Sequence, residues 1–230
     1  MAGRLSLRRM PQERRDVPLH GYKLAYPMLS AEGTDAGFTG VSLGRTYAYR
    51  VEAEAKCAQS SRHQSPSRLC DCGFYCFHEL TDARALACDP QYQQSVLLEV
   101  DAAGRYFRYE RGLRYSRQTV RAVHAGLCAC GWPAQVFVAT GTGVVGWRKL
   151  LPVCSTCAGN RPPLTLEHFG RLAGVPVHRD DRAVAFTTGA QAAGPEMVPL
   201  LSAEVALLHA RLDELQTQLD QLTRGSGPPT

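Results

Sequence analysis

The sequence predicts a β-rich α+β protein with a zinc-ribbon-like hairpin of antiparallel strands and a C-terminal coiled-coil helix. Three observations predict this class: most of the nine cysteines form spaced pairs, glycine-containing turns separate short β-prone segments, and a leucine repeat lies near the end of the chain. The 230 residues, 44 % of them apolar, suffice for one substantial core or two small ones. We therefore expect one main domain flanked by tails.

The expected domains follow changes in composition along the chain. Residues 1–19 hold five arginines and two prolines without a hydrophobic period, which is typical of a disordered basic arm. The remaining segments are a zinc-stabilised α+β domain at 20–190 with a ribbon-like part at 126–158, a linker at 191–199, a coiled-coil helix at 200–223 and a flexible tail at 224–230.

Strands are predicted where β-branched and aromatic residues alternate with polar ones between glycines. The expected segments are a strand at Thr46–Ala53, a hairpin of 95–100 and 105–109 with its turn at 102–104, and a hairpin of 134–139 and 144–150 with its turn at 141–143. Helices are expected at Glu79–Ala87 and at Leu166–Ala173, the second with Thr165 as N-cap and Gly174 as its stop.

The C-terminal segment carries the clearest periodic signal in the chain. Its apolar residues, spaced alternately by four and three, form an a/d seam: Leu201, Val205, Leu208, Leu212, Leu215, Leu219 and Leu222. A narrow seam on a polar helix buries well against a similar helix, so we expect a homo-oligomer or a partner coiled-coil protein. Packing of this helix onto its own domain is the alternative.

Composition restricts the compartment and the kind of partner. The odd number of cysteines and the lack of an apolar signal region predict a reducing, cytoplasmic location. No apolar run approaches the roughly twenty residues that span a bilayer, so no membrane partner is expected. The net charge of +5 is well below what a dedicated nucleic-acid coat would carry.

Two cysteine pairs flank the second expected hairpin. Cys128 and Cys130 precede it, and Cys154 and Cys157 follow it. A tight hairpin brings such pairs to one tetrahedral point, and a closed four-sulfur site is one that Zn²⁺ prefers. This order resembles a zinc ribbon and predicts structural Zn²⁺, with free buried thiols or a redox disulfide as alternatives.

A second candidate zinc site lies upstream and combines three sulfurs with one imidazole. Its members are Cys57, His63, Cys70 and Cys72. The fourth ligand stays open from spacing alone, because Cys76, His78 and Cys88 are also near in sequence, and Cys70 and Cys72 could instead join the downstream pairs. Zinc is favoured over an iron–sulfur cluster because neither common ferredoxin spacing occurs.

The stretch of roughly residues 45 to 158 resembles a group of uncharacterised actinobacterial zinc-binding proteins. The shared features are Ala55-Lys56-Cys57, His63 with Pro66, the segment Cys70-Asp71-Cys72-Gly73-Phe74-Tyr75, the hairpin region 95–112 and the second Cys-x-Cys-Gly pair. The chain departs from the group at Cys76, where the group has Ala. The resemblance implies that Cys57, His63, Cys70 and Cys72 act as one unit, and it implies no activity.

The predicted function is that of a non-enzymatic, zinc-stabilised binding or regulatory protein. Nucleic-acid contact is one hypothesis within it, because arginines interleave with aromatic residues over 105–121: Arg105, Arg108, Arg111, Arg114 and Arg117. A redox or zinc-release sensor that uses Cys76 and Cys88 is the first alternative. A zinc hydrolase is the second, although the cysteine-rich sets look closed and no catalytic zinc motif occurs.

Overall fold

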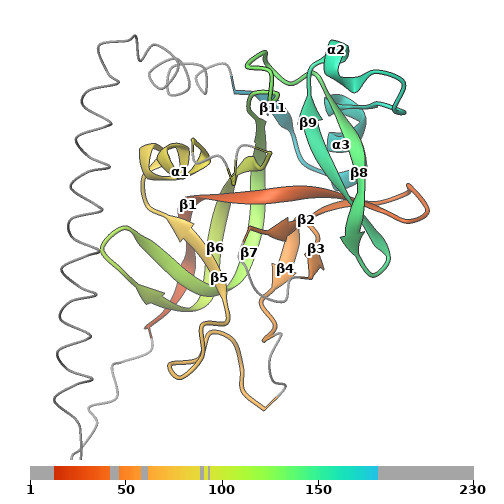
Figure 1. Ribbon diagram of the computed structural model, residues 1–230. Coiled ribbons are helices and arrows are strands. Elements are labelled where there is room, and N and C mark those ends of the chain that lie inside the picture. The colour runs from red at the N-terminus through yellow and green to blue at the C-terminus, as the bar shows by residue number, and fades with distance from the viewer. Residues whose placement is uncertain (1–12, 42–46, 58–61, 89–90, 93, 181–230) are drawn as a thin grey trace, which may run out of the picture. The chain divides into compact units, whose positions relative to one another are not determined.

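The computed structural model describes residues 13–41, 47–57, 62–88, 91–92 and 94–180. The chain consists of two compact units, Met1–Phe186 and Thr187–Thr230, and the second unit lies wholly outside the described residues. The elements shown in Figure 1 are β1 (Glu13–Ser30), β2 (Ala36–Gly40), β3 (Ala48–Tyr49), β4 (Glu52–Glu54), β5 (Phe74–Phe77), α1 (Leu80–Ala87), β6 (Val96–Arg108), β7 (Gly112–Ala125), β8 (Val136–Val144), β9 (Trp147–Val153), α2 (Ser155–Ala158), β10 (Leu164–Thr165), α3 (Leu166–Ala173) and β11 (Val177–Arg179).

The fold is mostly antiparallel β-sheet, which corrects the predicted α+β class. The strands join into one eleven-stranded sheet, and among the described strand pairs only β7 with β11 is parallel. The helices of the described part are three, none longer than eight residues. The class also included a C-terminal coiled-coil helix, and no such helix occurs among the described residues. Its expected segment, 200–223, lies outside them, together with the seven seam residues.

Strand β1 is the longest element, with 18 residues, and it organises the sheet. It pairs with β2, β5, β6 and β9, so segments from most of the described sequence meet along it. The strand begins at Glu13, where Glu13–Arg15 pair with Tyr106 to Gly104 of β6. The described residues of the predicted basic arm, 13–19, therefore form the start of β1, and Glu13–Arg15 and Leu19 are paired with β6. Residues 1–12 lie outside the description.

Four strands pair in a closed circuit. Strand β1 pairs with β6, β6 with β7, β7 with β5, and β5 returns to β1 through the single residue pair Tyr22 and Phe77. One face of these strands carries the main buried cluster, which includes Phe74, Leu98 and Tyr115. The opposite face of β1 and β6 packs against α1 through a smaller cluster around Ala83. Two apolar layers thus hold the circuit on both sides.

Of the two predicted hairpins only the second exists, and it turns later in the sequence than expected. The prediction of the first was wrong, because the segments expected to pair, 95–100 and 105–109, lie in the single strand β6. Strand β6 passes through the predicted turn and pairs with β7, and β8 passes through its glycines to reach a two-residue turn before β9. The glycines form bulges instead, at positive φ values of 74° for Gly104 and 79° for Gly141. Hydroxyl oxygens bond to the backbone at these irregularities: Ser116 accepts from the amide of Arg105 at 2.9 Å, and Thr140 from that of Thr142 at 3.1 Å.

The two helix predictions agree with α1 and α3. Helix α3 begins and ends as predicted, because the Thr165 hydroxyl accepts the amide of His168 and Gly174 adopts a left-handed conformation. The strand predicted at Thr46–Ala53 is instead divided between β3 and β4. The division lets β3 pair with β2 while β4 pairs with β7.

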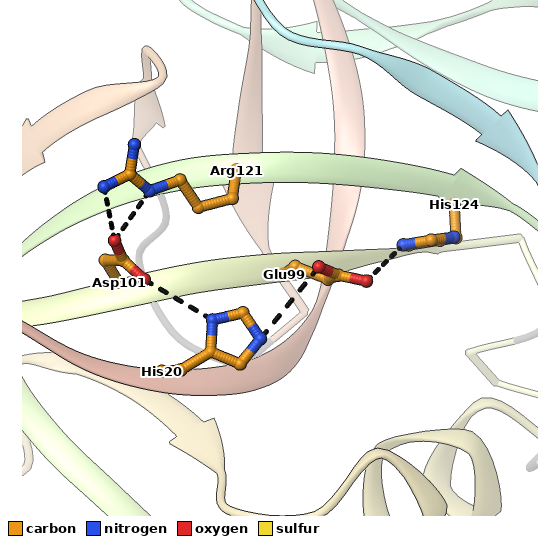
Figure 2. Close-up of polar contacts among 5 residues, drawn as sticks. All are labelled: His20, Glu99, Asp101, Arg121 and His124. Carbon is orange, nitrogen blue, oxygen red and sulfur yellow. Dashed lines mark hydrogen bonds and ion pairs between the residues drawn. The ribbon is translucent and has the colours of Figure 1, made fainter.

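The outer face of β1, β6 and β7 carries a row in which acidic side chains alternate with histidines and an arginine (Figure 2). Asp101 accepts from Arg121 at 2.6 Å and lies 3.4 Å from Nδ1 of His20. Glu99 lies 4.0 Å from Nε2 of His20 and 2.9 Å from Nε2 of His124. These cross-strand contacts link β1, β6 and β7 on the face opposite the main core.

Candidate metal centres

The structure brings together two groups of possible metal ligands, and they are the two sets predicted from the sequence. The first group is Cys57, His63, Cys70 and Cys72, and the second is Cys128, Cys130, Cys154 and Cys157. Within each group, one ligand atom from every residue lies within 4.8 Å of the others. Each group is thus geometrically able to hold one metal ion.

The distances within the groups match a tetrahedral metal site. The sulfurs of Cys57 and Cys70 are 3.7 Å apart, and those of Cys130 and Cys154 are 3.6 Å apart. A disulfide would require about 2.0 Å. Four sulfurs at 2.3 Å from a common Zn²⁺ would lie about 3.8 Å from one another. The observed spacing therefore fits coordination and not a direct sulfur–sulfur bond.

The loop of the first group is held by arginines from the neighbouring hairpin. Arg114 of β7 donates to the carbonyl of Cys70 at 2.7 Å and to that of Ser67 at 3.0 Å. Arg105 of β6 donates to the carbonyl of Ser65 at 2.8 Å. Charge-assisted bonds of this kind fix a loop that lacks regular secondary structure. His63 is then positioned with its Nε2 atom 3.3 Å from the sulfur of Cys72.

Arg114 is a buried anchor of this loop. The residue is 5 % exposed, and its guanidinium carbon lies 4.7 Å from the centre of the Phe107 ring. Its Nε atom has no hydrogen-bond partner among the described residues. A buried guanidinium is costly unless carbonyls and an aromatic face compensate for lost water. The two loop carbonyls are therefore its main compensation, and they couple the ligand loop to β7.

Gly73, directly after Cys72, packs too closely for a side chain. Its φ is +131°, and an added Cβ would lie 2.9 Å from Cγ of Arg114. We expect Gly73→Ala to cost about 1–3 kcal/mol of unfolding free energy and to weaken metal binding by the first group. Gly141→Ala is the matched control, because φ there is +79° but nothing lies within 4 Å. Chemical denaturation and metal content measure both effects. Equal losses in the two variants would contradict the packing argument.

The second group lies at the base of the β8–β9 hairpin. The amide of Cys128 donates to the carbonyl of Trp132 at 2.8 Å, and Gly131 donates to the carbonyl of Cys128 at 2.8 Å. Gly131 has a φ of 88°, which closes this tight turn. A small buried cluster that includes Val138 and Val153 packs beside the sulfurs.

Cys154 combines the roles of ligand candidate and helix cap. It is the N-cap of α2, and its sulfur accepts the amide of Cys157 at 3.4 Å. This bond lowers the pKa of Cys154, whereas the crowded neighbouring sulfurs raise the pKa of Cys157. Gln135 accepts the amide of Ser155 at 2.9 Å and holds the start of the helix beside the hairpin. Four thiols so close together favour a bound cation over four free thiolates.

The three residues that the spacing also allowed as a fourth ligand of the first group lie outside both groups. Cys76 is 5 % exposed, and burial raises its pKa to about 11. His78 directs Nε2 to the carbonyl of Tyr109 at 3.2 Å. Cys88 follows α1 and belongs to neither group. Cys70 and Cys72 are grouped with Cys57 and His63, not with the downstream pairs.

The five arginines proposed to contact nucleic acid do not form one exposed surface. Arg105 and Arg114 donate to backbone carbonyls of the ligand loop, and Arg111 pairs with Asp82 on α1. Arg108 and Arg117 are exposed. A spacing of three places residues on alternating faces of a strand, which explains why the row divides.

The described residues define an antiparallel β-sheet protein with two four-ligand clusters of Cys and His. No protein-family model, curated protein or solved structure matches the chain. Among the described residues, the helices are too short and too polar for any of them to span a lipid bilayer. Function is therefore argued from the geometry of the clusters.

Proposed function

We propose that the chain is a non-enzymatic binding protein in which both clusters hold structural Zn²⁺. The observation that carries this proposal is the convergence of four ligand atoms within 4.8 Å in each of two groups. Their donor sets, three sulfurs with one imidazole and four sulfurs, are those of structural zinc sites. Thiolate and imidazole donors also disfavour magnesium and calcium, which take oxygen ligands.

The composition of the clusters argues against zinc catalysis. A catalytic zinc keeps a coordination position open for water or substrate, whereas four protein ligands close the tetrahedron. Each described group supplies four such ligands and includes no carboxylate. A hydrolase role would need one ligand to leave, and nothing in the geometry favours that. The metal in this proposal folds the loops around it and takes no part in a reaction.

Metal counting by native mass spectrometry tests the proposal. We expect two zinc ions per chain, and one zinc ion in Cys72→Ser or in Cys130→Ser, because either change removes a ligand from one group only. Cys88→Ser is the matched control, since Cys88 belongs to neither group, and it should retain both ions. A metal-free wild type that remains folded would refute the proposal. Visible absorbance from iron would show that the clusters hold an iron–sulfur centre and not zinc.

Oxidation-dependent zinc release is a second candidate function, favoured by the exposure of Cys130 and Cys157. Exposed thiolates are the ones that oxidants reach. Cys76, which the sequence suggested for this role, is unsuited because it is 5 % exposed and belongs to neither group. If release occurs, mild hydrogen peroxide should remove one zinc ion and oxidise the second group. Retention of both ions after oxidation would eliminate this candidate.

A further inference from the structure

A cavity of about 780 Å³ lies beside the closed strand circuit. Aromatic and aliphatic side chains line most of it, among them Tyr47, Tyr49, Phe74 and Leu113. Three candidate ligands of the first metal group, Cys57, Cys70 and Cys72, form part of the wall. The volume falls within the range of small-molecule sites, which are typically apolar with a few directed polar groups.

One of those polar groups is a buried ammonium. Lys23 of β1 lines the cavity and is 7 % exposed. Its Nζ donates to Oε1 of Gln118 at 3.3 Å and lies 5.1 Å and 4.7 Å from the ring centres of Tyr49 and Phe74. No carboxylate among the described residues pairs with it. Burial lowers the pKa of Lys23 to about 8, so the charged form still predominates at neutral pH.

Two further buried polar groups lie beside Lys23. The amide of Gln118 donates to the hydroxyl oxygen of Tyr49, and the described residues offer no acceptor for the hydroxyl proton, although the two residues are only 3 % and 6 % exposed. Oε1 of Gln118 already accepts from Lys23 and from Tyr115. The cluster is therefore rich in donors and poor in acceptors. Buried donors are nearly always satisfied, so an acceptor is the missing component.

We propose that the cavity binds a small, largely apolar molecule that carries a carboxylate, with the carboxylate on Lys23 and the apolar body among the aromatic rings. A carboxylate supplies a negative charge for the ammonium and lone pairs for the hydroxyl of Tyr49. The other lining cations, Lys56 and Arg111, are exposed, and Arg111 already pairs with Asp82. Lys23 supplies one buried positive charge. A carboxylate carries one negative charge, whereas a phosphate group carries between about one and two, so the carboxylate is the better match.

This inference names the ligand class of the proposed binding protein. It rests on the proposed function in one respect, because the first metal group forms part of the cavity wall. Matched probes separate charge from shape. The probes are 2-naphthoate and the uncharged 2-naphthamide, measured by titration calorimetry on full-length protein of known zinc content. We expect wild type to bind the carboxylate at least tenfold more tightly than the amide. Lys23→Met should remove this preference while leaving the amide affinity unchanged.

The controls keep the test independent of folding. Lys23→Met removes a buried charge and should raise the thermal unfolding midpoint. Lys149→Met is the matched variant, because Lys149 lies on the Tyr26 ring at 3.3 Å and is not part of the cavity lining, and it should keep the tenfold preference. Absence of binding, equal binding of both probes, or an unchanged preference in Lys23→Met would overturn the ligand proposal. If wild type purified without zinc still binds the carboxylate tenfold more tightly than the amide, the ligand proposal is supported and the zinc proposal is overturned.

Discussion

If both clusters hold zinc as proposed, removal of the zinc by a chelator is expected to unfold both ligand loops and to lower the stability of the whole sheet. Structural zinc contributes on the order of 10 kcal/mol of apparent free energy to small zinc domains, which is comparable to the total stability of a typical domain. The bonds from Arg105 and Arg114 tie the described part of the first loop to the sheet. Thermal unfolding followed by circular dichroism, with and without chelator, measures the loss.

The control for this prediction is chelator that has been saturated with zinc before addition. It should leave the unfolding midpoint unchanged, because it removes no metal. Zinc added back should restore the midpoint, whereas magnesium should not, since thiolate and imidazole donors suit zinc. A protein that loses its zinc yet keeps its midpoint would show that the clusters do not stabilise the fold.

Arg114→Ala is expected to cost on the order of 3 kcal/mol of unfolding free energy and to release zinc from the first group. Hydrogen bonds to charged groups contribute about 1.5–3 kcal/mol each, and the change would remove the guanidinium donors from two loop carbonyls. The affected carbonyls belong to Cys70 and Ser67. Arg114→Lys should recover only part of the stability, because one ammonium cannot reproduce the planar fork. Urea denaturation and zinc content together measure the effect.

Arg117→Ala is the matched control on the same strand. Arg117 is exposed, so its loss should change the stability by less than about 0.5 kcal/mol and leave both zinc ions bound. A similar loss in Arg114→Ala and Arg117→Ala would mean that general charge, and not the buried anchor, supports the loop. Full zinc occupancy in Arg114→Ala would show that zinc binding by the first group does not depend on Arg114.

The second ligand set could be predicted from spacing because its chemistry is local, whereas spacing alone left the membership of the first set open. Cys-x-Cys-Gly and Cys-x-x-Cys are short spacings whose sulfurs can meet after a single turn, and the intervening hairpin needed only approximate placement. Helix α3 was predictable for the same reason, since Thr165 and Gly174 act on their own neighbours. The imidazole of His63 was the least certain ligand, because a polar loop gives no periodic signal.

The strand circuit could not be predicted, because its signals are not local. Residues 21 to 28 of β1 are mostly buried and lack the alternation that marks a strand with one exposed face. Gly104 and Gly141 were interpreted as turns, since glycine is common to turns and bulges, and only the partner strand distinguishes the two. Lys23 was overlooked because a single lysine in a sequence gives no sign of burial.

The placement of β1 bears on how the chain folds. It is the first element of the described sequence, yet its partners β6 and β9 begin at Val96 and Trp147. Such long sequence separations raise contact order, which slows folding because long loops must close before the pairings form. During synthesis, β1 therefore emerges well before β6 and β9 exist, although β2 follows it directly. Its edges need protection from aggregation until the C-terminal half of the sheet leaves the ribosome.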